Sequence, residues 1–319
     1  MHVRLLCFAP AVFALACGEP KSGPSTSSSS HFLSCSQDAD CDNLPVAASC
    51  GPKGVCVNGT TNIERDVVLE DNFDGSVLDA KSFTPELGFS IRNGEAQYYL
   101  GGPENLSVAG GQLVLTARAE AHEEAQFTSA SIETRGLHSW TYGLFEARIL
   151  APTGRGCSPS FWLYPEAPGA PVKLCTSFTA CATEILPAWG DIVVMNVRSE
   201  QADRVRHATD YATPSDTLPV PGPAEGGGST TLEQDASAEY HEYSAFWGPK
   251  RIDWFVDGEL QASFDITSTD IHHPEGKNPF MQPFHLKLSL ALGGLAEAPV
   301  AADYAQEMRV DWVRVTQFK

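Results

Sequence analysis

Hydrophobic and polar residues alternate in short runs along most of the chain after residue 66. Within 251–258, Ile252, Trp254 and Val256 occupy every second position, so a strand would turn all three side chains to one face. The run closes on Asp257 and Gly258, a pair that favours a two-residue hairpin turn. This pattern predicts antiparallel strands joined by tight turns.

The same alternation recurs over 308–315, where it predicts that Met308, Val310 and Trp312 share one face of a strand and Val313 the other. A stretch rich in Pro and Gly, 213–238, is predicted to be a long loop. Many short strands with turns between them predict an all-β, antiparallel sandwich. The other runs of β type lie at 112–117, 129–135, 143–151, 191–197, 243–247 and 283–292.

The first 34 residues have a different pattern. A 12-residue apolar run follows Arg4; it is too short to cross a bilayer core of about 30 Å, and it predicts a signal peptide over 1–16. The tetrapeptide Ala-Leu-Ala-Cys that ends at Cys17 resembles a bacterial lipobox. We therefore expect a lipidated Cys17, a Ser/Pro tether over 17–34 and an exported protein anchored in the bacterial cell envelope. An ordinary signal peptide with a nearby cysteine is the alternative.

Cysteines mark a small module over 35–60, which is too short to hold a core without cross-links. An even cluster of cysteines in an exported chain predicts two disulfides, with three connectivities open, and a zinc site is the rival interpretation. The four are Cys35, Cys41, Cys50 and Cys56. Cys175 and Cys181 are close enough in sequence for a third bridge, which leaves Cys157 unpaired.

Charge narrows the range of partners. The formal net charge of -19 argues against nucleic acid, whose phosphates require a basic face. Apolar residues make up 42% of the chain, enough for a sizeable core. We expect a monomer that contacts a membrane only through its lipid anchor and acts on a neutral ligand.

Several segments occur in an order that resembles a known family. The chain carries EDNFDGSVLD at 70–79, NGEAQYY at 93–99, TSASIETRG at 128–136, YGLFEARILAPTGRG at 142–156, PSFWLYP at 159–165, LSLALGG at 288–294 and MRVDWVRV at 308–315. Over 66–319 they resemble glycoside hydrolase family 16, the laminarinase and β-glucanase type. The resemblance implies a concanavalin A-like β-jelly roll with an open cleft that binds polysaccharide.

The resemblance aligns the family's catalytic motif, G-E-I-D-I-M-E, with GDIVVMN at 190–196. Retaining glycosidases use two carboxyl groups about 5–5.5 Å apart, and a strand with one bulge brings both glutamates and the middle aspartate to one face. Asp191 then takes the nucleophile position, Val193 replaces the middle Asp and Asn196 replaces the acid/base. An amide delivers no proton at neutral pH, and losing a positioned acid costs about 10²–10⁴ in rate. The shorter nucleophile costs about another 10².

Positions that hold the sugar in the family differ as well. By the same alignment Leu186 and Ser158 replace tryptophans, Ser131 replaces an arginine and Ser289 an asparagine. The side chains that remain for sugar contact are Asn93, Tyr98, Trp140, Trp162 and Trp189. Trp162 fits the cleft and the core equally well.

Metal chemistry has little support in the sequence. The resemblance implies a structural calcium near Glu70 and Asp311, although both could be surface acids. His207 and the pair His272 and His273 lack ligand spacing and are expected to be solvated loop residues. No cofactor is required.

The function favoured by the sequence is a lipid-anchored protein whose family-16-like domain binds carbohydrate and has lost most or all hydrolysis. One alternative is an active retaining endo-β-glycosidase, acting on β-glucan or a related polysaccharide, whose second carboxylate comes from elsewhere. Glu184, Glu200 and Asp203 are the nearby acids along the chain. Another alternative is an envelope scaffold that contacts protein.

Overall fold

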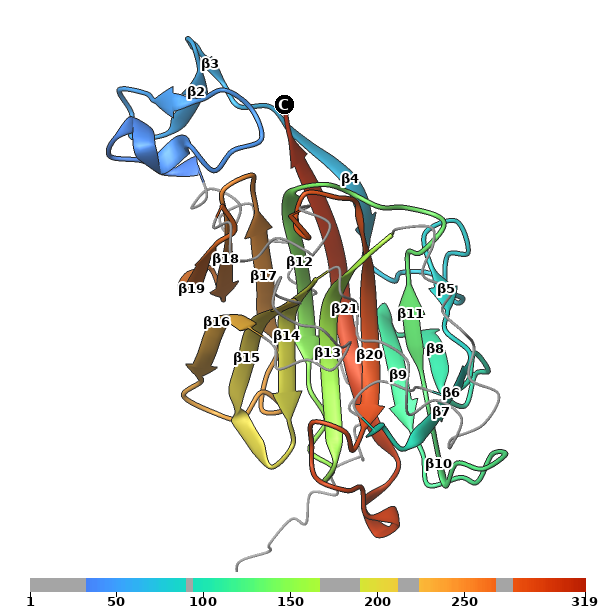
Figure 1. Cartoon of the computed structure of the whole chain (residues 1–319). Coiled ribbons are helices and arrows are strands. Elements are labelled where there is room, and N and C mark those ends of the chain that lie inside the picture. The colour runs from blue at the N-terminus through green and yellow to red at the C-terminus, as the bar shows by residue number, and fades with distance from the viewer. Residues whose placement is uncertain (1–32, 90–93, 167–189, 212–223, 268–277) are drawn as a thin grey trace, which may run out of the picture.

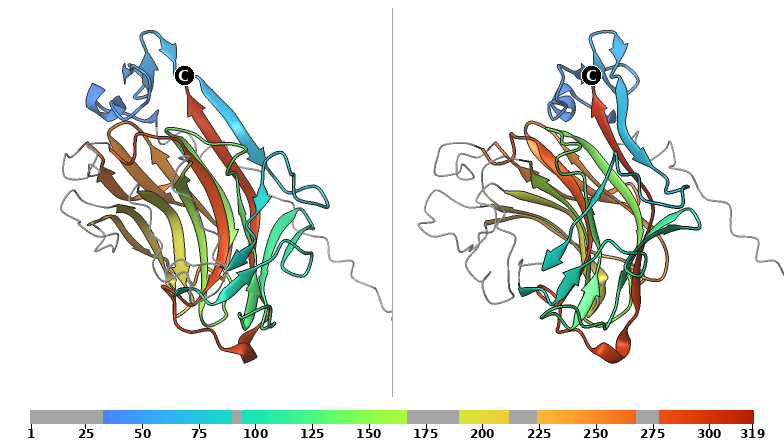
Figure 2. Two further views of the ribbon diagram at one scale, coloured as in Figure 1. Left: turned by 45° about the vertical axis from the view of Figure 1, so that its right-hand side comes forward. Right: turned by 90° about the vertical axis from the view of Figure 1, so that its right-hand side faces the viewer.

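A computed structural model describes the chain in five stretches, 33–89, 94–166, 190–211, 224–267 and 278–319. Two antiparallel sheets pack face to face and contain most of the strand residues, which confirms the predicted all-β sandwich (Figure 1, Figure 2). In the described part of the chain, no helix is long and apolar enough to cross a membrane.

The eight-stranded sheet has the order β19-β18-β17-β12-β21-β9-β8, and β4 also pairs with β21. Its strands are β4 (Arg65–Asp71), β8 (Leu106–Ala109), β9 (Gln112–Ala117), β12 (Gly143–Leu150), β17 (His241–Trp247), β18 (Arg251–Val256), β19 (Glu259–Asp265) and β21 (Gln306–Phe318).

The seven-stranded sheet has the order β16-β15-β14-β13-β20-β11-β5. Its strands are β5 (Thr84–Pro85), β11 (Ser131–Glu133), β13 (Cys157–Pro165), β14 (Asp191–Arg198), β15 (Gln201–Tyr211), β16 (Ala224–Thr231) and β20 (Phe284–Leu292). We call the side of this sheet turned away from the eight-stranded sheet its outer face.

Smaller elements complete the chain. β6 (Gly88–Phe89) and β10 (Phe127–Ser129) flank β7 (Gln97–Tyr99) in a short sheet, and η5 (Ala301–Asp303) precedes β21. In the N-terminal module, η2 (Asp38–Cys41) precedes a three-stranded sheet of β1 (Ser49–Cys50), β2 (Cys56–Asn58) and β3 (Thr61–Asn62).

Alternating residues of the two sheets form the core between them. Ile252, Trp254 and Val256 of β18 all lie in it, as the period of two predicted. The β18–β19 turn has positive φ at Asp257 (51°) and Gly258 (82°), which is the geometry of the predicted two-residue hairpin.

The face assignment in β21 was wrong after Val310. Met308 and Val310 belong to the core, but so do Val313 and Val315, whereas Trp312 is outside that cluster. The register against β12 shifts by one residue between Val310 and Trp312, so a bulge reverses the alternation. A bulge leaves no clear mark in a hydrophobic pattern.

The predicted loop 213–238 also contains a strand, β16, whose glycines conceal it in the sequence. A Cβ on Gly227 would lie 2.3 Å from the carbonyl oxygen of His207, and its φ of +104° disfavours other residues. A Cβ on Gly226 would overlap the ring of Phe264. These glycines let the edge strand approach β15 and β19 closely.

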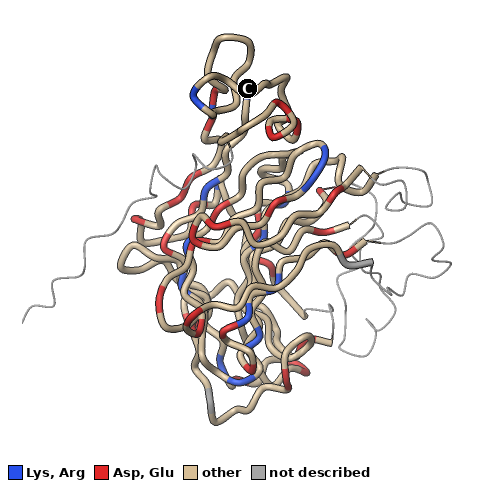
Figure 3. Tube along the Cα trace, turned by 90° about the vertical axis from the view of Figure 1, so that its left-hand side faces the viewer, with Lys and Arg blue, Asp and Glu red and all other residues tan. Residues whose placement is uncertain are grey.

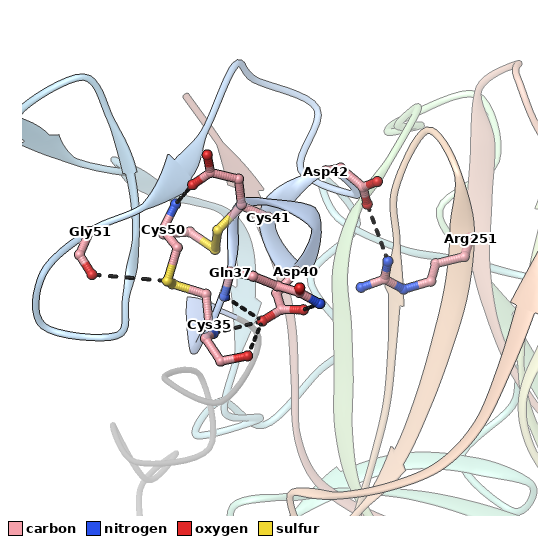
Figure 4. The surroundings of a disulfide bond; sticks show 11 residues. Cys35, Gln37, Asp40, Cys41, Asp42, Cys50, Gly51 and Arg251 are labelled. Atoms are coloured by element: carbon pink, nitrogen blue, oxygen red, sulfur yellow. Dashed lines mark hydrogen bonds and ion pairs between the residues drawn. A yellow bond between two sulfur atoms is a disulfide. The ribbon is translucent and has the colours of Figure 1, made fainter.

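The cysteine module is cross-linked by Cys35–Cys50 and Cys41–Cys56, one of the three connectivities open from sequence (Figure 4). Cys157 is unpaired and buried, as expected, and burial raises the pKa of its thiol to about 12. The sequence prediction for Cys175 and Cys181 lies outside the described residues.

The module packs against the eight-stranded sheet rather than standing apart as a spacer (Figure 1). Its buried Leu44 belongs to one apolar cluster with Phe246, Phe255 and Phe318 of the sheet. Asn43 secures this contact, since its side-chain oxygen accepts the backbone N–H groups of Lys250 (3.1 Å) and Arg251 (2.8 Å).

We predict that Asn43→Ala lowers the free energy of unfolding by about 2–4 kcal/mol, because two backbone donors lose their acceptor at a buried contact. Urea unfolding of the purified protein measures this. The matched control is Asn58→Ala, an exposed asparagine in the same module, which should change stability by less than about 0.5 kcal/mol. Equal effects of the two substitutions would contradict the role given to Asn43.

Candidate functional site

A row of polar side chains crosses the seven-stranded sheet at right angles to its strands. Each member is the cross-strand partner of the next, which places them on neighbouring strands at one level. Asn196 lies in the middle of this polar row. In order from β11 to β16, its members are Ser131, Ser289, Ser160, Asn196, Arg206 and Ser229.

The strand that supplies Asn196 is β14, and a bulge divides it. Val193 pairs with Ala208 and Asn196 with Arg206, so Val194 and Met195 together oppose the single residue His207. Because of this extra residue, the side chain of Asn196 lies on the outer face, like that of Val193 three positions earlier. The expected bulge is therefore present in this strand.

Gly190 leads the chain into β14. Its φ is +82°, and a Cβ there would lie 3.0 Å from the Cβ of Pro279 and 3.1 Å from the ring of Phe280. Glycine is therefore required where the chain enters the site strand.

His207 fills the gap that the bulge creates. Its Nδ1 donates to the carbonyl oxygen of Val194 at 2.9 Å, and its Nε2 lies 3.1 Å from the Thr230 hydroxyl. The side chain is fully buried, and this burial lowers the pKa of the imidazole to about 4. The expectation of a solvated loop histidine was wrong, because a lone histidine in sequence does not reveal which backbone carbonyl lacks a partner.

Asn196 is held as a hydrogen-bond donor to β13. Its Nδ2 donates to the hydroxyls of Ser158 and Ser160, each at 2.8 Å. Its Oδ1 is buried and accepts no hydrogen bond from the described residues. The amide therefore presents one unused acceptor, and only 1% of the residue is exposed.

Val193 lies in an apolar cluster on the outer face with Trp162, Tyr164 and Ala208. The rings of Trp162 and Tyr164 stack with centroids 5.5 Å apart. Trp162 therefore belongs to the outer face and not to the core between the sheets.

Asp191 begins β14 and is 3% exposed. Its Oδ1 accepts the backbone N–H of Asp210 at 3.1 Å, and Asp210 is its cross-strand partner on β15. Cβ atoms of such partners are about 4.5–5.5 Å apart, so a second carboxylate lies beside Asp191. The Asp210 carboxylate itself accepts a hydrogen bond from Arg206 at 2.8 Å.

Sequence reasoning missed Asp210, because it considered only Glu184, Glu200 and Asp203 as further acids. A signal was present in RVRHATD (204–210), where Arg204, Arg206 and Asp210 share one phase of a period-two pattern.

A cluster of charges lies at the other side of the outer face, around His285 of β20. Its Nδ1 is 3.1 Å from a carboxylate oxygen of Glu166, and its Nε2 is 3.6 Å from one of Glu133. Next to it, the buried Lys287 forms an ion pair with Glu86. None of these residues was singled out from the sequence.

Burial lowers the pKa of His285 and favours the neutral imidazole. Burial alone would raise the pKa of Glu133, but the neighbouring His285 and the charges of Lys287 and Arg135 outweigh it, and the net pKa is lowered. Glu133 is thus held as a carboxylate among cations, an arrangement that disfavours proton donation.

Of the other residues predicted to contact sugar, the structure describes Trp140 and Tyr98, and neither belongs to the polar row. Trp140 was assigned wrongly, since it packs in the core with its ring edge-on to Phe145. Tyr98 packs against Phe89 and His122, whereas its neighbour Tyr99 faces Lys287 at 5.6 Å. Asn93, Trp189 and Leu186 lie outside the described residues.

Calcium at Glu70 and Asp311 remains a sequence prediction. Asp311 accepts a hydrogen bond from Arg148 at 2.8 Å, and Glu70 is exposed. Among the described residues, the one group of ligand atoms close enough for a metal belongs to Cys35, Cys41 and Cys56, all of which are in disulfides.

Two hollows adjoin the polar row. A narrow one includes Ser158, Ser160, Ser289 and Lys287 among its lining residues. The other, which we call the edge hollow, extends from Asn196 to the glycines of β16 and has a volume of about 460 Å³. Because Ser158 and Ser160 bond Asn196, the two hollows adjoin at this residue.

The structure defines a class: a two-sheet antiparallel sandwich in which the polar row and its two adjoining hollows, together called the groove, lie across one sheet. A profile of glycosyl hydrolases family 16 matches residues 220–314. A β-glucanase of Rhodothermus marinus is 34% identical over 257 residues, covering 78% of this chain and 84% of that protein. This chain belongs to glycosyl hydrolases family 16.

Comparison with solved structures supports the same family assignment. The laminarinase from Rhodothermus marinus superposes with a TM-score of 0.68 at 30% identity and covers 81% of this chain and 99% of its own. The laminarinase catalytic domain from Thermotoga maritima gives a TM-score of 0.65 at 27% identity over 80% of this chain and 98% of its own. The predicted family and jelly-roll fold are confirmed.

We predict that acidification weakens the fold through His207. The unfolded chain protonates this histidine as the pH falls through about 6.5, whereas the folded chain does so only near 4. Between these values the unfolded state binds more protons, so the free energy of unfolding decreases, by about 2 kcal/mol from pH 7.5 to pH 5.

Urea unfolding of wild type and His207→Gln at the two pH values measures this contribution. The decrease should be smaller in the variant by that amount, and an NMR titration should place the midpoint of His207 below pH 5. Parallel pH profiles together with a midpoint near 6.5 would refute the assignment.

Proposed function

We propose that this protein binds polysaccharide in the groove along the polar row and hydrolyses it very weakly or not at all. The observation that carries the proposal is the state of Asn196, whose amide donates to Ser158 and Ser160. The residue aligned with the family's acid/base is thus a fixed amide.

Glycoside hydrolysis by the retaining mechanism requires proton transfers that Asn196 cannot perform. Retaining hydrolysis needs a carboxylic acid that protonates the leaving oxygen and later deprotonates water. The Asn196 amide does neither at neutral pH, and its N–H groups are already engaged. Its unused Oδ1 is a buried acceptor whose desolvation costs about 1–3 kcal/mol. A sugar hydroxyl would satisfy it, so the same atom that favours ligand binding contributes nothing to bond cleavage.

Val193 supports the same proposal. It is fully buried against Trp162 and Tyr164, where the family motif has an aspartate. Val193 has no charge and no hydrogen-bonding group with which to couple to the ionisation of Asp191. The stacked aromatic pair beside it offers a platform for the face of a sugar ring.

The relatives identify a ligand to test first. The relative from Rhodothermus marinus is named a β-glucanase. The similar solved structure from the same organism is named a laminarinase. A β-1,3-glucan is therefore the first neutral polysaccharide to try. A scaffold that contacts protein remains the other non-enzymatic alternative.

One observation favours an active enzyme as a second candidate. Asp210 is the cross-strand partner of Asp191, so two residues with carboxylate side chains are neighbours on adjoining strands. The ion pair with Arg206 opposes protonation of Asp210, and a proton donor must be protonated to act. We therefore rank this candidate second.

We predict that the purified protein binds laminarin but releases reducing ends at least about 10⁴-fold more slowly than an active family-16 glucanase. Affinity electrophoresis measures the binding and a reducing-end assay the turnover. Asn196→Glu supplies a carboxyl group in place of the amide. It should raise any residual turnover, and it would do so most in combination with Val193→Asp.

Asp191→Ala and Asp210→Asn are the matched controls. Wild-type turnover comparable to that of an active glucanase and abolished by either substitution would establish the enzyme instead. The absence of any carbohydrate binding, together with the absence of turnover, would favour a protein-contacting scaffold.

Export and anchoring form a separate part of the proposal, which rests on the sequence alone. We predict that the protein expressed with residues 1–34 in a bacterium fractionates with membranes and incorporates labelled palmitate. Cys17→Ser should abolish both, because lipidation requires the thiol, whereas Cys7→Ser should leave both unchanged. Palmitate labelling that persists in Cys17→Ser would contradict the lipobox.

A further inference from the structure

The edge hollow is basic although the protein is strongly acidic. Asp and Glu residues are spread over the molecule, whose formal net charge is -19 (Figure 3). Yet Arg198, Arg204 and Arg206 all line this hollow, and its described lining contains no Asp or Glu. Three guanidinium groups in one hollow repel one another unless an anion lies between them.

Register places these cations next to the polar row. Arg206 is the cross-strand partner of Asn196, and Arg204 lies two residues before it on β15. Arg206 already donates to Asp210. The side chains of Arg198 and Arg204 make no hydrogen bond or ion pair with the described residues, so their guanidinium donors remain for a ligand.

The floor of the edge hollow is made of small residues. Ala208 and Gly227 are cross-strand partners, and Gly228 and Ser229 continue the lining along β16. The volume of about 460 Å³ lies within the range of small-ligand sites. A planar guanidinium group bonds a sulfate or carboxylate through two parallel N–H donors.

We propose that the edge hollow binds the sulfate ester or carboxylate of an anionic sugar unit in a polysaccharide lying along the polar row. Arg198 and Arg204 contact the anion, and Asn196 Oδ1 accepts a hydroxyl of the adjoining part of the ligand. This rests on the proposed function, because the same groove must hold the polysaccharide. It changes the expected ligand from a neutral glucan to one that carries negative charge.

Three probes test the proposal on the full folded protein: laminarin, sulfated laminarin with the same backbone, and polygalacturonate. Affinity electrophoresis or calorimetry gives each Kd. At least one anionic probe should bind about tenfold or more tightly than laminarin, the size expected of a charge-assisted hydrogen bond. Tighter binding of sulfated laminarin would indicate a sulfate ligand, and tighter binding of polygalacturonate would indicate a carboxylate.

Arg198→Gln and Arg204→Gln should each weaken the anionic probe about tenfold and change laminarin binding by less than about twofold. The matched control is Arg309→Gln, a partly exposed arginine on the other sheet, which should leave every Kd unchanged. Because the side chains of Arg198 and Arg204 make no hydrogen bond or ion pair with the described residues, neither substitution should lower the Tm.

The outcomes separate the two proposals. Equal affinity for laminarin and both anionic probes, or equal losses in Arg309→Gln, would overturn the anion site and leave polysaccharide binding intact. Binding of none of the three would contradict the proposed function together with the anion site.

Discussion

The site depends on the hydrogen bond between the His207 imidazole and the carbonyl oxygen of Val194. A bulge in β14 is what returns Asn196 to the outer face, and a bulge leaves a backbone group without its ladder partner. An unsatisfied buried carbonyl costs about 1–3 kcal/mol, so the bulge persists because a neutral histidine from β15 donates to it. The low pKa of His207 keeps the imidazole in the uncharged form within the buried strand pair.

Once the bulge is fixed, the polar row follows from the register. Asn196 then opposes Ser160 on one side and Arg206 on the other, and it bonds to β13 through two serine hydroxyls. Small serines where the family resemblance expects Trp, Arg and Asn leave the floor of the groove rich in hydroxyls. A groove of this kind can bond sugar hydroxyls along its length without a positioned acid.

The fold was largely predictable, because a period of two and the order of family segments both survive in a single sequence. Ile252, Trp254 and Val256 occupy the core as their alternation indicated. The prediction of which side chains face the core failed where one extra residue changes the phase of the alternation, as between Val310 and Trp312. The prediction of strands failed where glycines replace apolar residues, as at Gly226 and Gly227. Neither a bulge nor a glycine strand carries a hydrophobic period.

The site was predictable only along one strand. Asp191, Val193 and Asn196 could be read from the motif, since they are neighbours in sequence. For Asp210 and Arg206 the sequence shows only a shared period-two phase, because their positions beside Asp191 and Asn196 come from the pairing of β15 with β14. The same pairing decides the chemistry: a carboxylate beside Asp191 is bound to a guanidinium that stabilises its charge, while the amide at 196 donates hydrogen bonds but releases no proton at neutral pH. A groove with fixed charges and fixed amides is suited to holding a saccharide, and cleaving one requires a group whose protonation changes.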